Sequence, residues 1–402
     1  MKKFTIKKLF AVLCLALLVP MSAFADVEIN ETNFPDANFR NWLLEQEYGQ
    51  DGVITDDEIA WIRNIDVSKE WETPNEEKIS TLEGIQHFTA LELLNCYNNQ
   101  LTSLDVTNNT ALTELWCHFN QLTSLNVSGC TALTGLWCSV NQLTSLDVTN
   151  NTALTWLYCE SNQLTSLDVS NNTALTSLQC NSNQLTSLDV TNNTALTGLQ
   201  CSSNQLTSLD VSNNTALDYL DCSHNQLTSL DVTNNTALTG LQCYYNQLTS
   251  LDVTNNTALT RLQCGRNQLT SLDVSNNTAL EWLDCDNNNI KGANMDAFIS
   301  SLPNRYGIIY IYDSTSETEG NVCTKSQVAK IKEKGWTPYK YNYGWVEYEG
   351  SDDPTGIDAT EMGNGDEICA NAVAYDLNGN RVEDWQSKKG VYIVGGKKVV
   401  VK

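Results

Sequence analysis

The sequence contains few basic residues and very little histidine. Its 402 residues include 23 Lys plus Arg against 48 Asp plus Glu, a formal net charge of −25, and only three His. Binding to phosphates requires clustered Lys and Arg, so this deficit argues against nucleic acid and anionic membranes as partners. His118 and His224 lie five repeat units apart, about 24 Å at the spacing of stacked strands, so they cannot share a proton.

Catalytic motifs and long apolar runs are also missing. We find no glycine-rich phosphate loop, no Cys-x-x-Cys pair and no nucleophile elbow, and therefore expect no enzymatic activity. The one extended apolar stretch, residues 9–19, is too short to span a bilayer well, so we expect no transmembrane segment. It follows four lysines and precedes Ala-Phe-Ala at residues 23–25, which predicts a signal peptide over residues 1–25 and hence a secreted protein.

What the chain does contain is a strict repeat of 21 residues. Ten cysteines mark it: Cys96, Cys117, Cys138, Cys159, Cys180, Cys201, Cys222, Cys243, Cys264 and Cys285. The segment Leu-Thr-Glu-Leu-Trp-Cys-His-Phe-Asn-Gln-Leu at residues 112–122 has leucine-rich-repeat spacing, with Cys in the third apolar position. We predict a mainly β solenoid, a right-handed superhelix of 21-residue repeats over residues 90–290. Such a fold offers a long open face, which favours binding over chemistry.

The cysteines of an exported protein would ordinarily suggest disulfides. Stacked strands lie about 4.8 Å apart, however, whereas a disulfide prefers Cβ atoms about 3.8 Å apart. We therefore predict a column of buried thiols that act as small apolar side chains. A metal-binding column is the alternative, although the flanking Leu side chains would desolvate a cation.

Within one repeat, Leu115 and Cys117 should face inward, and Asn120 should pair buried backbone groups at the bend. The return half is rich in Thr, Val and Asn and is a poor helix former, so we expect extended and turn structure. Its inward residues should be Leu143, Leu146, Val148 and Ala153. The Asp of each Leu-Asp-Val should accept hydrogen bonds from the following turn, and Cys130 should lie on a turn outside the column.

Both ends of the solenoid need caps. Residues 26–89 should form an α-helical N-terminal cap with helices over 39–46 and 56–64, followed by a degenerate first repeat. The loop between these helices resembles an EF-hand and is a candidate calcium site, although Gly49 departs from the pattern; its ligands would be Glu47, Asp51, Val53, Thr55 and Glu58. The alternative is a helix–loop–helix cap without an ion.

Residues 291–350 should form an α/β C-terminal cap, with helices over 295–302 and 325–334, a strand over 308–312 and an aromatic extended run over 336–348. We expect those aromatic residues to pack. Residues 351–402 should form a linker and a small terminal β-domain of two hairpins, turning at Asn378-Gly379 and Gly395-Gly396.

Two parts of the chain resemble known families. The unit Leu-Thr-Ser-Leu-Asp-Val-Ser-Asn-Asn-Thr-Ala-Leu, followed by Cys-x-x-Asn-Gln, resembles the leucine-rich-repeat surface proteins of Bacteroidetes, which are related in style to internalins. This resemblance implies an extracellular recognition scaffold. Tyr-Asp-Leu-x-Gly at 375–379, Gly-x-Tyr-x-Val at 390–394 and the Lys-Lys-Val-x-Val-Lys ending resemble the sorting domain of type IX secretion cargo, apart from Asn380. That second resemblance implies attachment to the outer cell surface.

Function should lie where the near-identical turns differ. The outward strand positions vary most and carry exposed aromatic and basic residues, which often mark a partner site. The candidate ligand-binding residues are Trp116, Phe119, Trp137, Trp156, Tyr158, Tyr244, Tyr245, Arg261 and Trp282. We expect a non-catalytic recognition or adhesion protein that binds a host or bacterial surface protein on its concave face. A carbohydrate-binding protein and a structural spacer are the alternatives, and cross-strand packing is the competing explanation of the aromatics.

Overall fold

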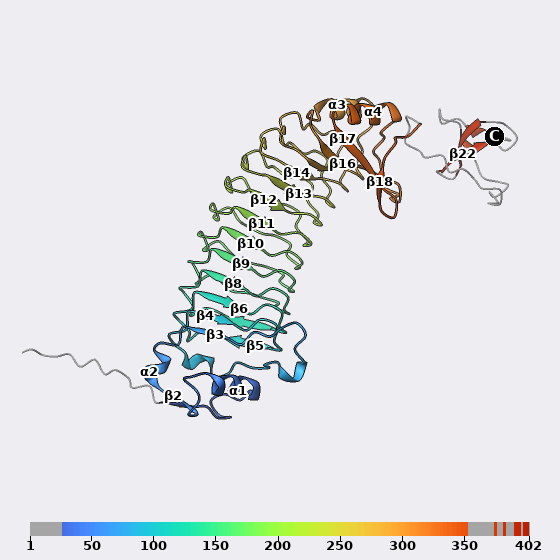
Figure 1. Ribbon diagram of the computed structural model, residues 1–402. Helices are drawn as coiled ribbons and strands as arrows, with labels where there is room; N and C mark the ends of the chain where they lie inside the picture. Colours follow the sequence, from blue (N-terminus) through green and yellow to red (C-terminus); the bar gives the residue numbers. More distant parts are fainter. Residues whose placement is uncertain (1–25, 353–373, 376–380, 383–389, 395–396, 402) are drawn as a thin grey trace, which may run out of the picture.

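The main structural element of the molecule is a sheet of short parallel strands stacked in register, as seen in the computed structural model (Figure 1). The structure describes residues 26–352, 374–375, 381–382, 390–394 and 397–401; the signal-peptide prediction lies outside them. The main sheet has 14 strands, and its order follows the chain except that β5 and β7 are absent from it. Its strands are β3 (Asn64–Asp66), β4 (Leu93–Asn95), β6 (Glu114–Trp116), β8 (Gly135–Trp137), β9 (Trp156–Tyr158), β10 (Ser177–Gln179), β11 (Gly198–Gln200), β12 (Tyr219–Asp221), β13 (Gly240–Gln242), β14 (Arg261–Gln263), β15 (Trp282–Asp284), β16 (Gly307–Asp313), β17 (Trp336–Tyr341) and β18 (Trp345–Glu347). The predicted repeat solenoid is confirmed.

The register of the strands places identical positions of successive repeats side by side. Leu115 of β6 pairs with Leu136 of β8, and the same offset of 21 residues holds through β15. The central Leu of each repeat strand and the ten column cysteines are fully buried. All ten are free thiols, as predicted from the strand spacing. The sequence period alone therefore identified the core.

Burial also keeps these thiols in their uncharged form. Loss of hydration raises the pKa of Cys117 to about 12 and that of Cys159 in the same direction. A thiol is nucleophilic mainly as the thiolate, so both access and charge state protect the column from reagents.

We predict that a small alkylating reagent, applied to the native protein at pH 8, will leave the ten column thiols unmodified. In guanidinium chloride all ten should react within minutes. Peptide mass spectrometry of the alkylated protein measures both states. Rapid labelling of most of these thiols in the native protein would contradict the stacked arrangement.

The predicted asparagine column is also present. The Nδ2 group of Asn120 donates to the carbonyl oxygens of Cys96 and Cys117 at 3.0 and 3.1 Å, and its Oδ1 accepts from the Leu101 N–H at 3.0 Å. One side chain thus joins its own turn to the preceding one. The equivalent Asn of later repeats repeats this pattern, which satisfies backbone groups that would otherwise be buried without partners.

A second inward asparagine column lies on the opposite side of the coil, where the sequence predicted only a turn. Its members are the second Asn of each Asn-Asn-Thr, all fully buried: Asn109, Asn151, Asn172, Asn193, Asn214, Asn235, Asn256 and Asn277. Cys130 occupies this column in its own repeat and is buried too, with its thiol 3.1 Å from the Val106 carbonyl oxygen. Ala153, which we expected to face inward, is only half-buried because Asn151 and Leu154 fill the interior.

Replacing Asn193 with Ala should lower the free energy of unfolding by about 2–4 kcal/mol, because two buried carbonyl oxygens lose their donor. Asn193 Nδ2 donates to the carbonyl oxygens of Val169 and Asn172 at 3.0 and 2.9 Å. The neighbouring Asn192 is exposed and makes one contact of 3.3 Å, so Asn192→Ala is the matched control and should cost under about 0.5 kcal/mol. Urea denaturation followed by circular dichroism measures both. Equal effects of the two substitutions would contradict a structural role for the second column.

The residue before each Asn of the first column adopts a left-handed backbone conformation. Its φ lies between 48° and 56° in all ten repeats, at Asn98, Phe119, Val140, Ser161, Ser182, Ser203, His224, Tyr245, Arg266 and Asn287. L-residues other than Asn and Asp rarely adopt this conformation. The position nevertheless accepts a β-branched Val and three residues with aromatic rings, so its identity is set by something other than backbone preference.

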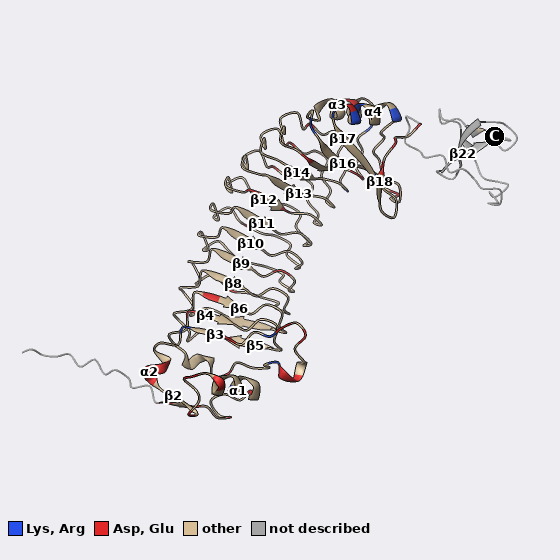
Figure 2. Cartoon of the chain, in the orientation of Figure 1, with Lys and Arg blue, Asp and Glu red and all other residues tan. Residues whose placement is uncertain are grey.

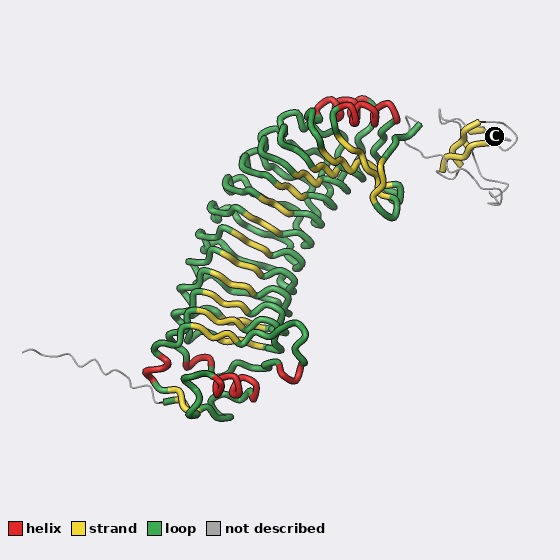
Figure 3. Tube along the Cα trace, viewed as in Figure 1, coloured by secondary structure: helices red, strands yellow, loops and turns green. Residues whose placement is uncertain are grey.

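The return half of each coil is extended and turn structure, as predicted. Residues 91–290, all of which are described, contain no helix (Figure 3). Two short strands, β5 (Ser103–Asp105) and β7 (Ser124–Asn126), pair with each other in the first coils only. Asp147 accepts a hydrogen bond from the Thr149 N–H at 3.0 Å, and the Asp of most later repeats does the same, which confirms the predicted role.

The N-terminal cap begins with β1 (Val27–Glu28), which pairs with β2 (Val53–Ile54). Helix α1 (Ala37–Glu45) matches the first predicted helix, whereas α2 (Asp56–Ile59) is only one turn long. The prediction of a helix to residue 64 was wrong because residues 64–66 form β3, the first strand of the main sheet. Two 3₁₀ turns, η1 (Asn75–Glu77) and η2 (Ile85–His87), complete the degenerate repeat.

The C-terminal cap continues the sheet and covers its end. Helix α3 (Ala293–Ser301), β16, α4 (Lys325–Glu333) and β17 follow the predicted order, and β17 and β18 form an antiparallel hairpin. β15, β16 and β17 pair in parallel, so cap and repeats share one sheet. None of the described helices combines the length and apolar character that crossing a membrane requires.

Both predicted terminal hairpins are present as strand pairs. β19 (Ala374–Tyr375) pairs with β20 (Arg381–Val382), and β21 (Gly390–Val394) pairs with β22 (Lys397–Val401). The order β20-β19-β21-β22 makes one small sheet. The predicted turn residues 378–379 and 395–396 lie outside the described residues.

Candidate functional site

The outward face of the main sheet carries two groups of aromatic side chains. Between them, β10 and β11 present Ser177, Gln179, Gly198 and Gln200, which are small or amide residues. Charged residues are likewise sparse on the middle turns and gather at the two ends (Figure 2). The predicted ligand-binding residues therefore do not form one site but fall into an N-terminal and a C-terminal set.

The N-terminal platform consists of Trp116, Trp137, Trp156 and Tyr158. The Trp116 and Trp137 rings are 5.4 Å apart between centroids, and Trp137 lies 6.3 Å from Trp156 and 5.9 Å from Tyr158. Trp156 remains 42% exposed. The sequence prediction of one contiguous platform is thus consistent with the ring positions.

Strand register explains how four large rings fit together. Trp116, Trp137 and Tyr158 occupy equivalent positions on β6, β8 and β9, whereas Trp156 pairs with Gly135 two residues earlier on the same face. The Trp137 ring lies over Gly135, where an added Cβ would be 2.4 Å from ring carbon Cζ3. Gly135 therefore provides the space in which the Trp137 ring rests.

Phe119 belongs to a neighbouring group. It lies on the left-handed turn after β6, with its ring 5.3 Å from Trp71 and 5.6 Å from Tyr97. Trp71 is 61% exposed and comes from the N-terminal cap. Sequence reasoning missed it because only the fold brings residues 71 and 119 together.

The C-terminal set joins predicted residues to side chains of the cap. The Arg261 guanidinium lies 4.9 Å from the Trp282 ring, and Trp282 contacts Tyr310 at 5.1 Å. Tyr310 in turn lies 4.2 Å from Trp345. We expected the aromatic run over 336–348 to pack only; Trp336 is indeed buried, but Trp345 is 44% exposed.

A pocket of about 250 Å³ opens beside this aromatic chain. Its lining comes from the turns after β13–β15 and from the β17–β18 hairpin: Tyr244, Tyr245, Gly265, Arg266, Asp284, Asp286, Tyr341 and Trp345. Tyr244 and Tyr245 were predicted site residues, whereas the others were missed. A sequence signal existed for Gly265 and Asp286. Each directly follows a column cysteine and so occupies the same repeat position as Tyr244.

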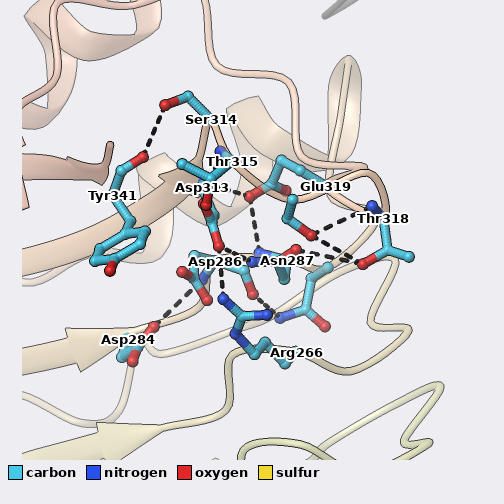
Figure 4. A network of polar contacts seen from close by, with 12 residues as sticks. Arg266, Asp284, Asp286, Asn287, Asp313, Ser314, Thr315, Thr318, Glu319 and Tyr341 are labelled. Atoms are coloured by element: carbon cyan, nitrogen blue, oxygen red, sulfur yellow. Dashed lines mark hydrogen bonds and ion pairs between the residues drawn. The ribbon is translucent and has the colours of Figure 1, made fainter. Parts of the chain in front are cut away.

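A polar network fixes the wall of this pocket (Figure 4). The Arg266 guanidinium pairs with the buried Asp313 carboxylate at 2.6 Å, and Asn287 Nδ2 donates to the same carboxylate at 3.1 Å. The Glu319 carboxylate accepts from the backbone N–H groups of Asn287, Asp313 and Asn321 at 2.7–2.9 Å. The cap thus holds the last repeat rigidly.

Two carboxyl groups of the pocket are shifted toward the neutral form. Burial, followed by repulsion from Asp286, raises the pKa of Asp284 to about 8. Burial raises the pKa of Asp286 to about 6 against the opposing effect of the Arg266 charge. The unpaired negative charge at this point therefore destabilises the folded protein as the groups ionise.

Replacing Asp284 with Asn should raise the Tm by about 2–6 °C at pH 8 and change it little at pH 4. The sign follows from linkage: a pKa raised above the unfolded value favours the folded state at low pH, and that contribution is lost as pH rises through about 8. Calorimetric scans between pH 4 and 8.5 measure it. Asp147, exposed and with a pKa lowered by its bonds to Thr149, is the control, and Asp147→Asn should not raise the Tm at pH 8. A Tm difference independent of pH would contradict the assignment.

The residues of the predicted calcium loop make local contacts. The Glu58 carboxylate accepts from the Thr55 N–H and hydroxyl at 2.8 Å each and so caps α2. The Asp51 carboxylate accepts from the Val53 N–H at 3.1 Å. No described contact involves the Glu47 carboxylate. Calcium binding stays a prediction.

Solved structures place this architecture among known proteins, although no family model and no curated protein matches the sequence. The functional domain of InlJ from Listeria monocytogenes, which includes a cysteine ladder, is 34% identical with a TM-score of 0.66, over 79% of this chain and 68% of that one. The chain belongs to the internalin-like leucine-rich-repeat family. The ladder of InlJ matches the most regular feature of this sequence, its ten stacked cysteines.

Two further structures agree in fold. The internalin InlF from Listeria monocytogenes is 23% identical, with a TM-score of 0.57 over 79% of this chain and 98% of that one. A leucine-rich-repeat protein of Leptospira interrogans is 24% identical, with a TM-score of 0.57 over 70% and 78%. An internalin-like repeat fold indicates a role in protein interaction or recognition for this chain as well.

Proposed function

We propose that this internalin-like protein is an extracellular adhesion or recognition protein that binds a protein ligand on the outward face of its sheet. The observation that carries the proposal is the N-terminal platform, a continuous group of Trp116, Trp137, Trp156 and Tyr158, in which Trp156 is exposed and the other three rings are half-buried. Large aromatic side chains supply much of the binding energy at protein interfaces.

The contrast with the rest of the sheet supports this assignment. β10 and β11 show that the fold needs only Ser, Gly and Gln at the outward positions, because those strands stack in the same register without aromatics. Stiffening of the sheet therefore does not require the platform. A purely structural spacer would have no use for exposed Trp side chains.

A carbohydrate ligand is the second candidate. The Trp137 and Trp156 rings lie 6.3 Å apart and only 29° from parallel, so together they present a broad aromatic surface of the kind that stacks on sugar rings. The same residues serve both hypotheses.

Export and retention at the outer cell surface complete the proposal. They are supported by the signal-peptide pattern of residues 1–25 and by the resemblance of the tail to type IX sorting domains. The similarity of the repeats to Bacteroidetes surface proteins points the same way. Detection of the protein on intact cells by antibody, with loss of the signal after deletion of residues 351–402, tests this part.

Simultaneous replacement of Trp116, Trp137 and Trp156 by Ala should reduce binding of the purified protein to its target at least tenfold. Binding to cultured cells and to glycan arrays, each measured with labelled protein, separates a protein ligand from a sugar. The control is Tyr306→Ala, since Tyr306 is 92% exposed but lies far from the platform in the chain. Unchanged binding of the triple variant would remove the platform from the proposal.

A further inference from the structure

We propose that the pocket between the turns after β13–β15 and the β17–β18 hairpin receives an ammonium group, the chemistry that a lysine side chain of a protein partner presents. The inference rests on the proposed function only in naming a protein as the source of that lysine. It assigns to the C-terminal set a role different from that of the platform.

The walls of the pocket suit a cation. Tyr341 and Trp345 lie 5.2 Å apart on the hairpin, and Tyr244 and Tyr245 lie 5.9 Å apart on the turn after β13. The faces of such rings attract a positive charge, most strongly where water is excluded. Four aromatic side chains from two separate elements thus line one cavity of about 250 Å³, large enough for the end of a lysine side chain.

Two carboxylates form the floor. Asp286 is only 5% exposed, and Asp284 is half-buried. A Cβ added to Gly265 would lie 2.6 Å from Asp286 Oδ1 and 2.8 Å from Asp284 Oδ1, so both oxygens converge on the open side of this glycine. The glycine thereby keeps open the space that Tyr or Asp fills in the adjacent repeats.

The Arg266 charge acts on both carboxyl groups, but its direct ion pair is with another residue. Arg266, the nearest cation in the lining, pairs with Asp313 and stacks on Tyr245 at 4.6 Å. In the part of the chain that the structure describes, no ion pair reaches Asp284 or Asp286. A cation between them would stabilise the ionised form of both carboxyl groups, which burial disfavours in the partly dry pocket, whereas an anion or an apolar group would not.

The shape of the cavity favours ammonium over guanidinium. An ammonium is compact and donates in three directions, so it can contact both carboxylates, which lie two residues apart at the end of β15, while its aliphatic stem lies along the rings. A guanidinium is planar and matches one carboxylate best, as Arg266 already does with Asp313.

The test is titration of the full chain with N-acetyl-lysine methylamide, followed by isothermal calorimetry and Trp fluorescence. We expect saturable binding with a Kd of roughly 1–10 mM, as fits a single buried charge contact. The norleucine analogue, which lacks only the ammonium, should not saturate, and the arginine analogue should bind more weakly.

Two independent variants should abolish the effect. The double variant Asp284→Asn with Asp286→Asn removes the charges, and Gly265→Ala places a Cβ against both carboxylate oxygens; each should weaken binding at least tenfold. Asp221→Asn is the matched control, since Asp221 holds the position equivalent to Asp284 three repeats earlier. Circular dichroism confirms that each variant is folded.

Absence of saturation up to about 50 mM, or equal binding of the lysine and norleucine analogues, would overturn the inference. So would unchanged binding in both variants. Binding must also persist when Trp116, Trp137 and Trp156 are replaced by Ala. Loss of cell binding together with retained lysine-analogue binding in that variant supports the pocket as a separate site, and failure of the pocket would leave the platform untouched.

Discussion

In-register stacking through buried side-chain amides is the constraint on which this molecule depends. Each turn exposes backbone carbonyl groups to the next turn, and no water reaches them. Asn120 on one side of the coil and Asn193 on the other show how the chain meets this demand, since each donates to two carbonyl oxygens. The ten column cysteines pack small apolar side chains into the interior of the coil. The first column ties each repeat to its predecessor, and the second does so in each repeat except the one in which Cys130 replaces the Asn.

This constraint separates positions that can vary from positions that cannot. Leu, Cys and Asn point into the coil and recur, whereas outward strand positions have no neighbour to satisfy except the adjacent strands. The rings of Trp116, Trp137 and Trp156 lie on this surface, where β10 and β11 stack in the same register without aromatic side chains. At the other end, the cap hairpin brings Trp345 against residues of the last repeats. The candidate recognition surfaces therefore consist of outward strand positions and cap residues, where the sequence departs from the repeat.

The periodic part of the fold was readable from the sequence, because a 21-residue spacing translates directly into strand register. Leu115, Cys117 and Asn120 were assigned correctly for that reason. The second column was missed since Asn-Asn-Thr is equally typical of an exposed turn, and nothing local distinguishes Asn192 from Asn193. The platform followed from adjacent strands, but the pocket did not: Asp284 and Trp345 are 61 residues apart and meet only through the cap. A contact between a repeat and the cap leaves no periodic signal in the sequence.

The left-handed residues that precede the first asparagine column combine a backbone strain with varied side chains. A bulky side chain in this conformation costs about 1–2 kcal/mol relative to glycine. This strain is present at Phe119, Val140, Tyr245 and Arg266. Yet this bend is where the chain leaves the strand and a side chain can reach beyond the sheet's own edge. An array with glycine at every bend would avoid this strain but would present no side chain there to a partner. This chain instead carries ten bends with varied side chains and tolerates the strain.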